Sequence, residues 1–485
     1  MLKHMLAADA TCDGKFITGV VSTGIYCLPS CRARKPKPEN VVFYASPTAA
    51  RAGGLRACLR CKPDDFHAGL TLDNHQAQEQ QLEEALSNLE LAEVRSVPAL
   101  ATHVGVGSSK LHNLFRVYLH FTPAEWLNRQ RVALARELLL TMPHAAAQIA
   151  FEVGFESLSA FGAQFRRWSA MTPQAFRLLP SGHPFCLDLP PGYSVPATLR
   201  GLGRDVQQTT ARVEGQTCTV ALRLPSGTAL LKLDVLPDRV RGELNHAPDN
   251  LTGKDALALH RTLLRLLGLQ THPARFEAQI AAAPHLSGLL TGQSGLRIPL
   301  VADPFDGLVW AVVGQQVSFK AACMFRRRLL ERVSPVVAEG LYAPPTPQAL
   351  CSLNIGEVQA AGLTRARAEL LHRVASMVLC GQLNLETLAN GTASRAERTL
   401  LAIPGIGPWT AQYVLLRVLG FQDAAPTGDS ALRSELQHFF GLASRPSPRQ
   451  AQQLLAPFAP YRSLATMHFW HRFTGRTRPA EQENP

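Results

Sequence analysis

Two pairs of closely spaced cysteines constrain the front of this chain more than any other feature. Three residues separate Cys27 from Cys31, and two separate Cys58 from Cys61. Thiolates at such spacings can both face one ion across a tight turn, and two such pairs make a tetrahedral zinc site. Four unrelated buried thiols are the alternative, which the paired spacing disfavours. We expect one Zn²⁺ that holds together a unit with little core of its own.

Basic side chains surround these cysteines. Between Arg32 and Lys62 the only acid is Glu39. A solvated face usually mixes both signs, whereas a face of one sign suits phosphate groups. The formal net charge of +12 over 485 residues also favours a polyanionic partner, although a soluble enzyme can be basic without one. The candidate phosphate contacts are Arg32, Arg34 and Arg60.

Residues 23–34 (TGIYCLPSCRAR) and 58–61 (CLRC) resemble the amino-terminal domain of Ada-type adaptive-response proteins, and the resemblance covers about residues 9–66. It implies that Cys27 attacks the methyl group of a DNA methylphosphotriester and keeps it irreversibly. Metal-bound thiolates are nucleophiles at neutral pH, so the chemistry is reasonable. Methylation removes one negative charge and would strengthen DNA binding. The resemblance thus implies transcriptional activation, with RNA polymerase as a partner of the methylated protein.

Two helix-turn-helix patterns follow. The first pairs residues 97–103 with 108–118, and the second pairs 145–153 with 157–168. Each second helix could lie in a major groove, with its apolar stripe in the core. The candidate DNA contacts are Lys110, Arg116, Arg166 and Arg167.

The second of these patterns also resembles a family. Residues 155–161 (FESLSAF), 165–168 (FRRW) and 172–177 (TPQAFR) resemble the carboxy-terminal signature of AraC-type regulators, which implies promoter DNA as a partner. The family usually has glycine where this chain has Ala170, which predicts a slightly altered turn.

The periodicity changes after a Pro/Gly/Ser stretch at 180–184. Residues 217–224 and 230–235 alternate like strands about a turn at Ser226-Gly227, and the pattern is helical again from Asp255. A helical linker is expected at 75–91. The predicted fold is multi-domain and mainly α. Its parts are a zinc-bound α+β module (1–72), an all-α double helix-turn-helix (78–180), an α+β domain (185–268) and an all-α helix-hairpin-helix domain (269–478).

Residues 404–407 (PGIG) lie between two helical segments and predict a helix-hairpin-helix. Gly405 and Gly407 would let backbone N–H groups approach a phosphate, and an ordinary helix-loop-helix turn is the alternative. Asp429 lies 22 residues beyond Gly407 (429 − 407). It is a candidate helix N-cap and a candidate catalytic carboxylate, and the two roles are compatible.

Together with residues 313–318 (VGQQVS) and 461–465 (YRSLA), this hairpin makes about residues 185–478 resemble the helix-hairpin-helix glycosylases, most closely 3-methyladenine DNA glycosylase II. The resemblance implies hydrolytic excision of alkylated purines with Asp429 as the catalytic carboxylate. It implies a base pocket of Trp409, Tyr413 and Trp470, each of which could instead be core.

The resemblance also assigns DNA contacts and a reaction type. Gln315 and Gln316 are candidate DNA contacts, and Gln316 stands where the close relative has a wedging leucine. Trp409 occupies the position of the Schiff-base lysine of lyase-type relatives, which implies a monofunctional glycosylase.

The competing class is a methylation-sensing regulator whose rear half binds damaged DNA without catalysis, and Asp429 argues against it. The chain has no apolar run of 18 residues and no secretory signal at its start. We therefore expect a cytoplasmic, nucleoid-associated protein whose partners are alkylated and promoter double-stranded DNA, with no membrane partner.

Overall fold

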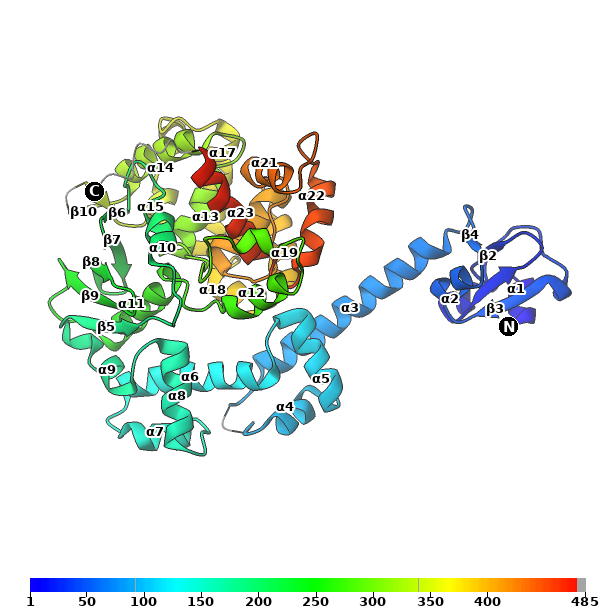
Figure 1. The fold of residues 1–485 in the computed structure, drawn as a ribbon, viewed down its shortest axis with the longest axis horizontal. Coiled ribbons are helices and arrows are strands. Elements are labelled where there is room, and N and C mark those ends of the chain that lie inside the picture. The colour runs from blue at the N-terminus through cyan, green and yellow to red at the C-terminus, as the bar shows by residue number, and fades with distance from the viewer. Residues whose placement is uncertain (92, 339, 478–485) are drawn as a thin grey trace. The chain divides into compact units, whose positions relative to one another are not determined.

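The computed structural model describes residues 1–91, 93–338 and 340–477, and it divides into two compact units, Met1–Asn88 and Leu89–Pro485 (Figure 1). The first unit contains a four-stranded sheet of order β3-β1-β2-β4. Strand β1 is antiparallel to β2 and β3, and β2 is parallel to β4. The elements are α1 (Leu2–Leu6), β1 (Ile17–Val20), β2 (Ile25–Cys27), β3 (Val41–Tyr44), α2 (Pro47–Ala52), β4 (Arg56–Ala57) and α3 (Pro63–Ser87).

The core of the first unit is small. Its main apolar cluster consists of the buried side chains of Ile17, Tyr26, Leu28, Ala50 and Leu55. A core of this size gives a small domain little stability, and such domains are usually held by a metal or by disulfides.

Helix α3 corrects the helix expected at 75–91. It begins at Pro63 and ends at Ser87, with Asn88 as its C-cap. Proline is favoured at the first position of a helix because its missing N–H needs no partner there. The helix is continuous through residues 72–78, where the sequence suggests a domain boundary.

The first helices of the second unit begin and end within one or two residues of the bounds expected for both helix-turn-helix patterns. The exception is the end of the first recognition helix, which is π-helical. Helix α5 continues as a π-helical segment, Phe115–Leu119. Ala170 ends α8 in the left-handed conformation, with φ of 54°, which agrees with the family preference for glycine there. The helices are α4 (Val97–Val104), α5 (Ser108–Leu114), α6 (Pro123–Thr141), α7 (Ala146–Glu152), α8 (Leu158–Ser169) and α9 (Pro173–Arg177).

An antiparallel sheet of order β5-β9-β8-β7-β6 follows. Leu224 pairs with Gly227, so the turn between β7 and β8 is at Pro225-Ser226, one residue before the expected position. The elements are β5 (Phe185–Asp188), α10 (Val195–Leu202), β6 (Ala211–Glu214), β7 (Thr217–Leu224), β8 (Gly227–Val235), β9 (Arg239–Asn245) and α11 (Gly253–Leu266).

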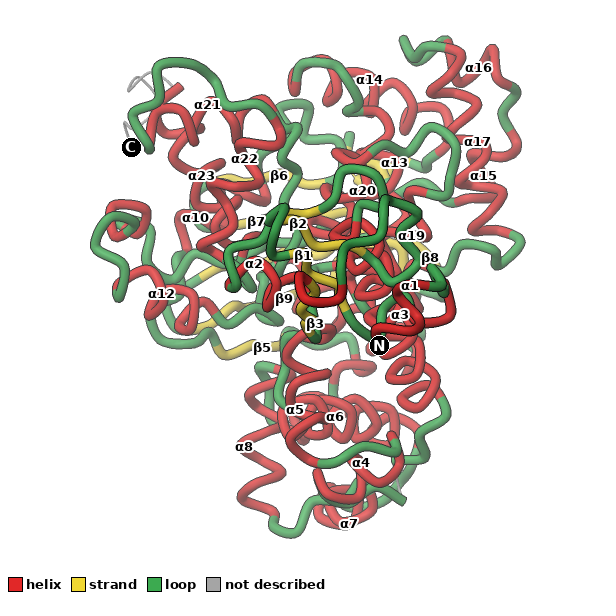
Figure 2. Tube along the Cα trace, turned by 90° about the vertical axis from the view of Figure 1, so that its right-hand side faces the viewer, coloured by secondary structure: helices red, strands yellow, loops and turns green. Residues whose placement is uncertain are grey.

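The remaining residues are mainly helical (Figure 2), with one short hairpin, β10-β11, and they enclose the largest apolar core. The elements are α12 (Pro273–Ala281), α13 (Pro304–Val313), α14 (Phe319–Val333), β10 (Val336–Ala338), β11 (Leu341–Tyr342), α15 (Pro347–Ser352), α16 (Ile355–Gln359), α17 (Arg365–Leu379), α18 (Leu385–Asn390), α19 (Ala393–Leu401), α20 (Pro408–Val414), α21 (Ser430–Phe439), α22 (Pro448–Leu455) and α23 (Arg462–Thr477). No helix of the described residues is both long and apolar enough to cross a membrane.

The second helix-turn-helix and the five-stranded sheet share one apolar core. The ring of Phe176 on α9 meets the ring of His260 on α11 at 4.9 Å, and a His260 ring nitrogen lies 2.8 Å from the carbonyl of Ser169. Across the same boundary, the Asp188 N–H donates to the carbonyl of Ala170 at 2.7 Å. The two substructures therefore pack as one body.

This shared core predicts joint unfolding. Phe176 is fully buried, and Phe176→Ala should cost about 3–5 kcal/mol of unfolding free energy. We expect amide hydrogen exchange, followed by mass spectrometry, to accelerate together in α8 and β7. Leu158→Ala, at a side chain that is 48% exposed, should leave both protected. Accelerated exchange in α8 with an unchanged β7 would show two independent domains.

Candidate functional site

The sheet of the first unit brings the four paired cysteines together. Strands β2 and β4 run side by side, so Cys27 at the end of β2 lies beside Cys58, whose N–H donates to the carbonyl of Tyr26 at 3.0 Å. A tight turn after each of these cysteines places Cys31 and Cys61 beside Cys27 and Cys58. The four Sγ atoms all lie within 4.8 Å of one another, as one tetrahedral ion requires.

The charges of this cluster call for a cation. The hydrogen bond to Cys61, followed by burial, raises the pKa of Cys27 well above its usual range, and the same hydrogen bond lowers the pKa of Cys61 to about 5. Four thiolates this close repel one another unless a positive ion lies among them. Sulfur donors in two short pairs are the set that zinc prefers, so the residues fit a zinc ion.

The cluster is not equally accessible on all sides. Cys31 and Cys58 are buried, whereas Cys27 and Cys61 are half-buried. The N–H of Leu28 donates to Cys61 Sγ at 3.4 Å, and Cys31 accepts from the backbone at Ala33. Of the two reachable sulfurs, only Cys61 accepts a backbone hydrogen bond among the described residues.

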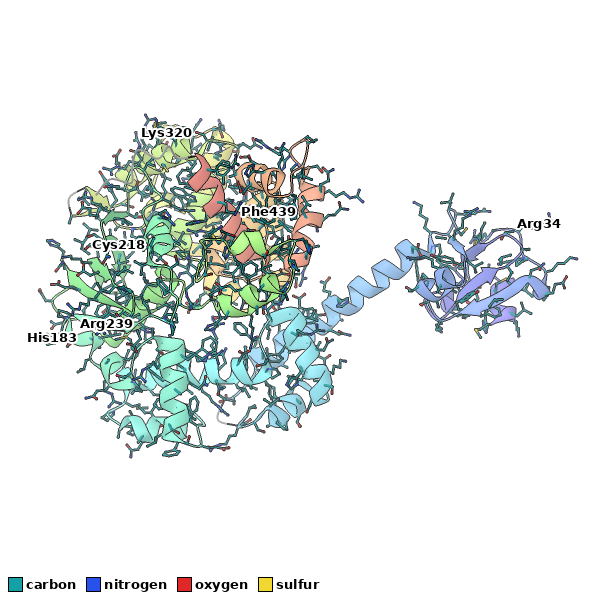
Figure 3. The ribbon with its side chains drawn as sticks, in the orientation of Figure 1. Arg34, His183, Cys218, Arg239, Lys320 and Phe439 are labelled. Atoms are coloured by element: carbon teal, nitrogen blue, oxygen red, sulfur yellow. The ribbon has the colours of Figure 1, made fainter. Side chains whose placement is uncertain are left out.

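The predicted phosphate contacts near the cluster lie on its surface. Arg32, Arg34 and Arg60 are exposed, and Figure 3 shows Arg34 projecting from the unit. Arg60 also donates to the carbonyl of Arg32 at 3.3 Å. Lys35 is engaged internally, because its ammonium donates to the carbonyls of Met5 and Cys31.

The candidate DNA contacts of the two helix-turn-helix modules are all exposed but differ in their ion pairs. Lys110 and Arg116 are exposed and make no ion pair within the described residues. Arg166 instead lies 3.3 Å from Asp188, and Arg167 lies 3.1 Å from Glu125. The start of α8 is also exposed, at the N-cap Ser157 and at Leu158, Ser159 and Ala160, and this part of a recognition helix typically contacts bases.

The hairpin lies between α19 and α20 as the PGIG motif predicts. Gly405 has φ of +100°, and a Cβ there would lie 3.1 Å from the Leu370 side chain, so glycine is required. Gly407 is the N-cap of α20 and has open space around it. The carbonyl of Pro404 accepts from Arg373 at 2.5 Å. The N–H groups of Gly405 and Gly407 make no hydrogen bond within the described residues.

Gln315 and Gln316 follow α13 and have different environments. The Gln315 amide donates to the carbonyl of Gly405 at 3.0 Å and to Thr410 Oγ1 at 3.1 Å, so it ties this segment to the hairpin. Gln316 is exposed and has φ of 51°, a conformation that residues other than glycine seldom adopt.

Three N–H groups converge on Asp429. The indole of Trp409 donates to Oδ2 at 3.3 Å, and the indole of Trp470 donates to Oδ1 at 3.0 Å. Asp429 is also the N-cap of α21 and accepts the N–H of Leu432 at 2.8 Å. A side chain in this position can cap α21 and still present a carboxylate to a ligand, so the two roles predicted from sequence are compatible in the structure.

The aromatic residues named from sequence form a cluster beside this carboxylate. Trp409 stacks on Tyr413 with ring centroids 5.4 Å apart, and Tyr413 lies 6.3 Å from Trp470. Tyr413 is buried, whereas both tryptophans are half-buried. The Tyr413 hydroxyl accepts a hydrogen bond from Arg204 at 2.7 Å, a contact between residues too distant in sequence for a local pattern to reveal.

Comparison with known families defines the class of this chain. Three families match it: the metal binding domain of Ada at residues 1–64, a helix-turn-helix domain at 100–178, and the HhH-GPD superfamily of base excision DNA repair proteins at 309–460. The fold and the sites therefore define a zinc-binding, DNA-binding protein that ends in a base excision repair fold.

Relatives narrow this class. The probable bifunctional transcriptional activator/DNA repair enzyme AlkA of Mycobacterium tuberculosis H37Rv is 30% identical over 482 residues, which cover 95% of this chain and 94% of that protein. The chain belongs to this family of bifunctional transcriptional activator/DNA repair enzymes. Escherichia coli DNA-3-methyladenine glycosylase 2 is 32% identical over 213 residues, covering 43% of this chain and 69% of that one.

A solved structure supports the fold of the rear half. The 3-methyladenine DNA glycosylase from Archaeoglobus fulgidus superposes with a TM-score of 0.54 at 20% identity. The match covers 61% of this chain and all of that one.

The cysteine cluster predicts a metal content. We expect the purified chain to contain zinc, and Cys58→Ser should lower zinc content and make the first unit sensitive to proteolysis, because the ion replaces missing core. Cys380→Ser, at an exposed thiol outside the cluster, is the control. Elemental analysis measures the zinc, and equal zinc in both variants would contradict the site.

Proposed function

We propose that the rear half of the chain hydrolyses the N-glycosidic bond of alkylated purines in DNA, with Asp429 as the catalytic carboxylate. The observation that carries this proposal is the convergence of two indole N–H groups and a helix N-terminus on Asp429, beside a cluster of three aromatic rings. The names of the E. coli and A. fulgidus relatives support the same substrate class.

The chemistry follows from how the alkylated base leaves. Alkylation at N3 or N7 makes a purine cationic, so the glycosidic bond is already weak. As the bond breaks, positive charge moves to the sugar, where the Asp429 carboxylate stabilises it. Aromatic faces at Trp409, Tyr413 and Trp470 would hold the flipped, cationic base. No lysine stands at the position of Trp409, so strand cleavage by Schiff-base chemistry is not part of the proposal.

We propose that the hairpin at residues 404–407 binds the DNA backbone. The unpartnered N–H groups of Gly405 and Gly407 suit a phosphate. Gln315 holds the neighbouring segment against the hairpin, so we assign it a positioning role. Gln316 is exposed in a strained conformation next to it, and we propose that its side chain enters the space left by the flipped nucleotide.

In the first unit we propose that Cys27 accepts a methyl group from a DNA methylphosphotriester. Zinc, when bound, would keep the four thiols deprotonated. The Cys27 sulfur would form a bond to the methyl carbon while the carbon–oxygen bond breaks, which leaves an ordinary phosphodiester. Cys27 suits this role because it is half-buried and, within the described residues, accepts no backbone hydrogen bond; such bonds lower the nucleophilicity of a thiolate.

The helix-turn-helix modules are the proposed readers of promoter DNA. The exposed Lys110 and Arg116 and the exposed start of α8 support this role. The relative from M. tuberculosis is named as a transcriptional activator, and we propose RNA polymerase as the partner of the methylated, promoter-bound protein. Removal of a negative charge at Cys27 would strengthen DNA binding and couple repair to activation.

Replacement of Asp429 tests the glycosylase. Asparagine has a single oxygen, so its NH₂ group would face one of the two indole N–H groups, and the charge is lost. We expect Asp429→Asn to lower the rate of 3-methyladenine release on the order of 10²-fold or more, whereas DNA affinity should be retained.

The control for this variant is Glu386→Gln, which removes a carboxylate from the exposed pair with Arg261. Single-turnover release of the free base measures both. Release at the wild-type rate by Asp429→Asn would leave Asp429 as a helix cap only and would favour a rear half that binds without catalysis.

The methyl acceptor has a separate test. After incubation with methylphosphotriester DNA, peptide mapping by mass spectrometry should find one methyl group, on the peptide that contains Cys27. Cys27→Ala should gain none, whereas Cys12→Ser, at a buried thiol outside the cluster, should gain it normally. A methyl group on Cys27→Ala would move the assignment to another sulfur.

A further inference from the structure

Two arginines meet at the hydroxyl of Tyr413. Arg204, in the loop after α10, donates to Tyr413 Oη at 2.7 Å. Arg417 follows Tyr413 by four residues (417 − 413) on the same helical segment and lies within hydrogen-bonding reach of the same oxygen. The side chain of Arg417 is buried, and its Nη1 lies 3.6 Å from Met467 Sδ on α23.

Asp205 and Asp306 line the same cavity as these two arginines, but both carboxylates pair with Arg326. Within the described residues neither Arg204 nor Arg417 makes an ion pair, and Arg417 Nε has no hydrogen-bond partner. The neighbouring Arg326 differs, because it lies 3.2 Å from Asp205 and 2.5 Å from Asp306. Arg204 and Arg326 both pack on the ring of Trp310.

Arg417 stays charged at neutral pH although it is buried. Burial, and then the neighbouring Arg204, lower the pKa of Arg417 to about 9, which still leaves the guanidinium charged. A buried charge that is not in an ion pair acts over a longer range than a solvated one because less water screens it.

We propose that Arg204 and Arg417 form a positive pole behind Tyr413 that draws electrons toward the departing base and sets which lesions are excised. The proposal rests on the proposed glycosylase function. The negative pole is Asp429, which accepts hydrogen bonds from the indoles of Trp409 and Trp470. The Tyr413 ring stacks on Trp409, and its hydroxyl lies on the side of the guanidiniums. A base held against these rings would lie between the two poles.

The two poles act on every substrate in the bond-breaking step. The C1′–N bond breaks and its electron pair leaves with the base, while a water oxygen bonds to C1′ and releases a proton to solvent. An alkylated cationic purine departs neutral. A neutral damaged purine departs as an anion that takes up a proton from solvent.

The poles discriminate at the binding step. The guanidiniums repel a cationic base as it enters the site, whereas a neutral base enters without this repulsion. As the neutral base departs and becomes anionic, the guanidiniums stabilise its negative charge. In terms of kcat/KM, the positive pole therefore favours neutral lesions relative to cationic ones. Arg204 and Arg417 are thus specificity-determining and positioning residues.

The test compares two lesions in one protein. Duplexes containing hypoxanthine, a neutral base, or 7-methylguanine, a cationic one, are given to the full chain and to Arg204→Gln and Arg204→Lys. We expect Arg204→Gln to lower kcat/KM for hypoxanthine on the order of tenfold and to leave that for 7-methylguanine unchanged or raised. Arg204→Lys keeps the charge and should keep the wild-type ratio.

Arg327→Gln is the matched control, because Arg327 packs on the ring of Tyr342 at 4.7 Å without contacting Tyr413, and its ratio should not change. An equal loss for both lesions in Arg204→Gln would mean that Arg204 only supports Tyr413, and would overturn the proposal. Wild-type release of 7-methylguanine without hypoxanthine would also overturn it. Release of neither base would instead refute the proposed glycosylase.

Discussion

The arrangement of the rear half depends on how one carboxylate is held. Asp429 accepts N–H groups from α20, α21 and α23, so this one carboxylate links three helices. The same hydrogen bonds orient Trp409 and Trp470 and thereby bring the aromatic cluster beside the carboxylate. The packing of these helices, their hydrogen bonds and the proposed chemistry therefore all involve one side chain, which also caps α21.

A second constraint is the shared core of the second helix-turn-helix and the five-stranded sheet. Contacts such as that of Phe176 with His260 give the second helix-turn-helix and the sheet a fixed relation. If the helix-turn-helix binds promoter DNA as proposed, the sheet that packs on it is held at that site as well. The cysteine cluster, in contrast, lies in a separate compact unit with its own small core.

Local patterns predicted much of this structure. The cysteine spacing identified the sulfur cluster, the glycine turns placed the recognition helices, and the PGIG motif and Asp429 located the candidate active site. The start of α3 at Pro63 was missed because a proline can begin a helix as well as interrupt one. The contacts of Arg204 with Tyr413 and of Arg166 with Asp188 join segments that only the folded chain brings together, so no local pattern indicates them.

The most direct test of the account is one reaction in which the intact protein meets duplex DNA that carries both methylphosphotriesters and alkylated purines. Protein mass, free bases and strand length are then measured in the same sample. The account predicts a gain of one methyl group per protein, release of 3-methyladenine and intact DNA strands at abasic sites. An unmodified protein would contradict the proposed role of Cys27, and strand cleavage or the absence of released base would contradict a hydrolytic glycosylase built around Asp429.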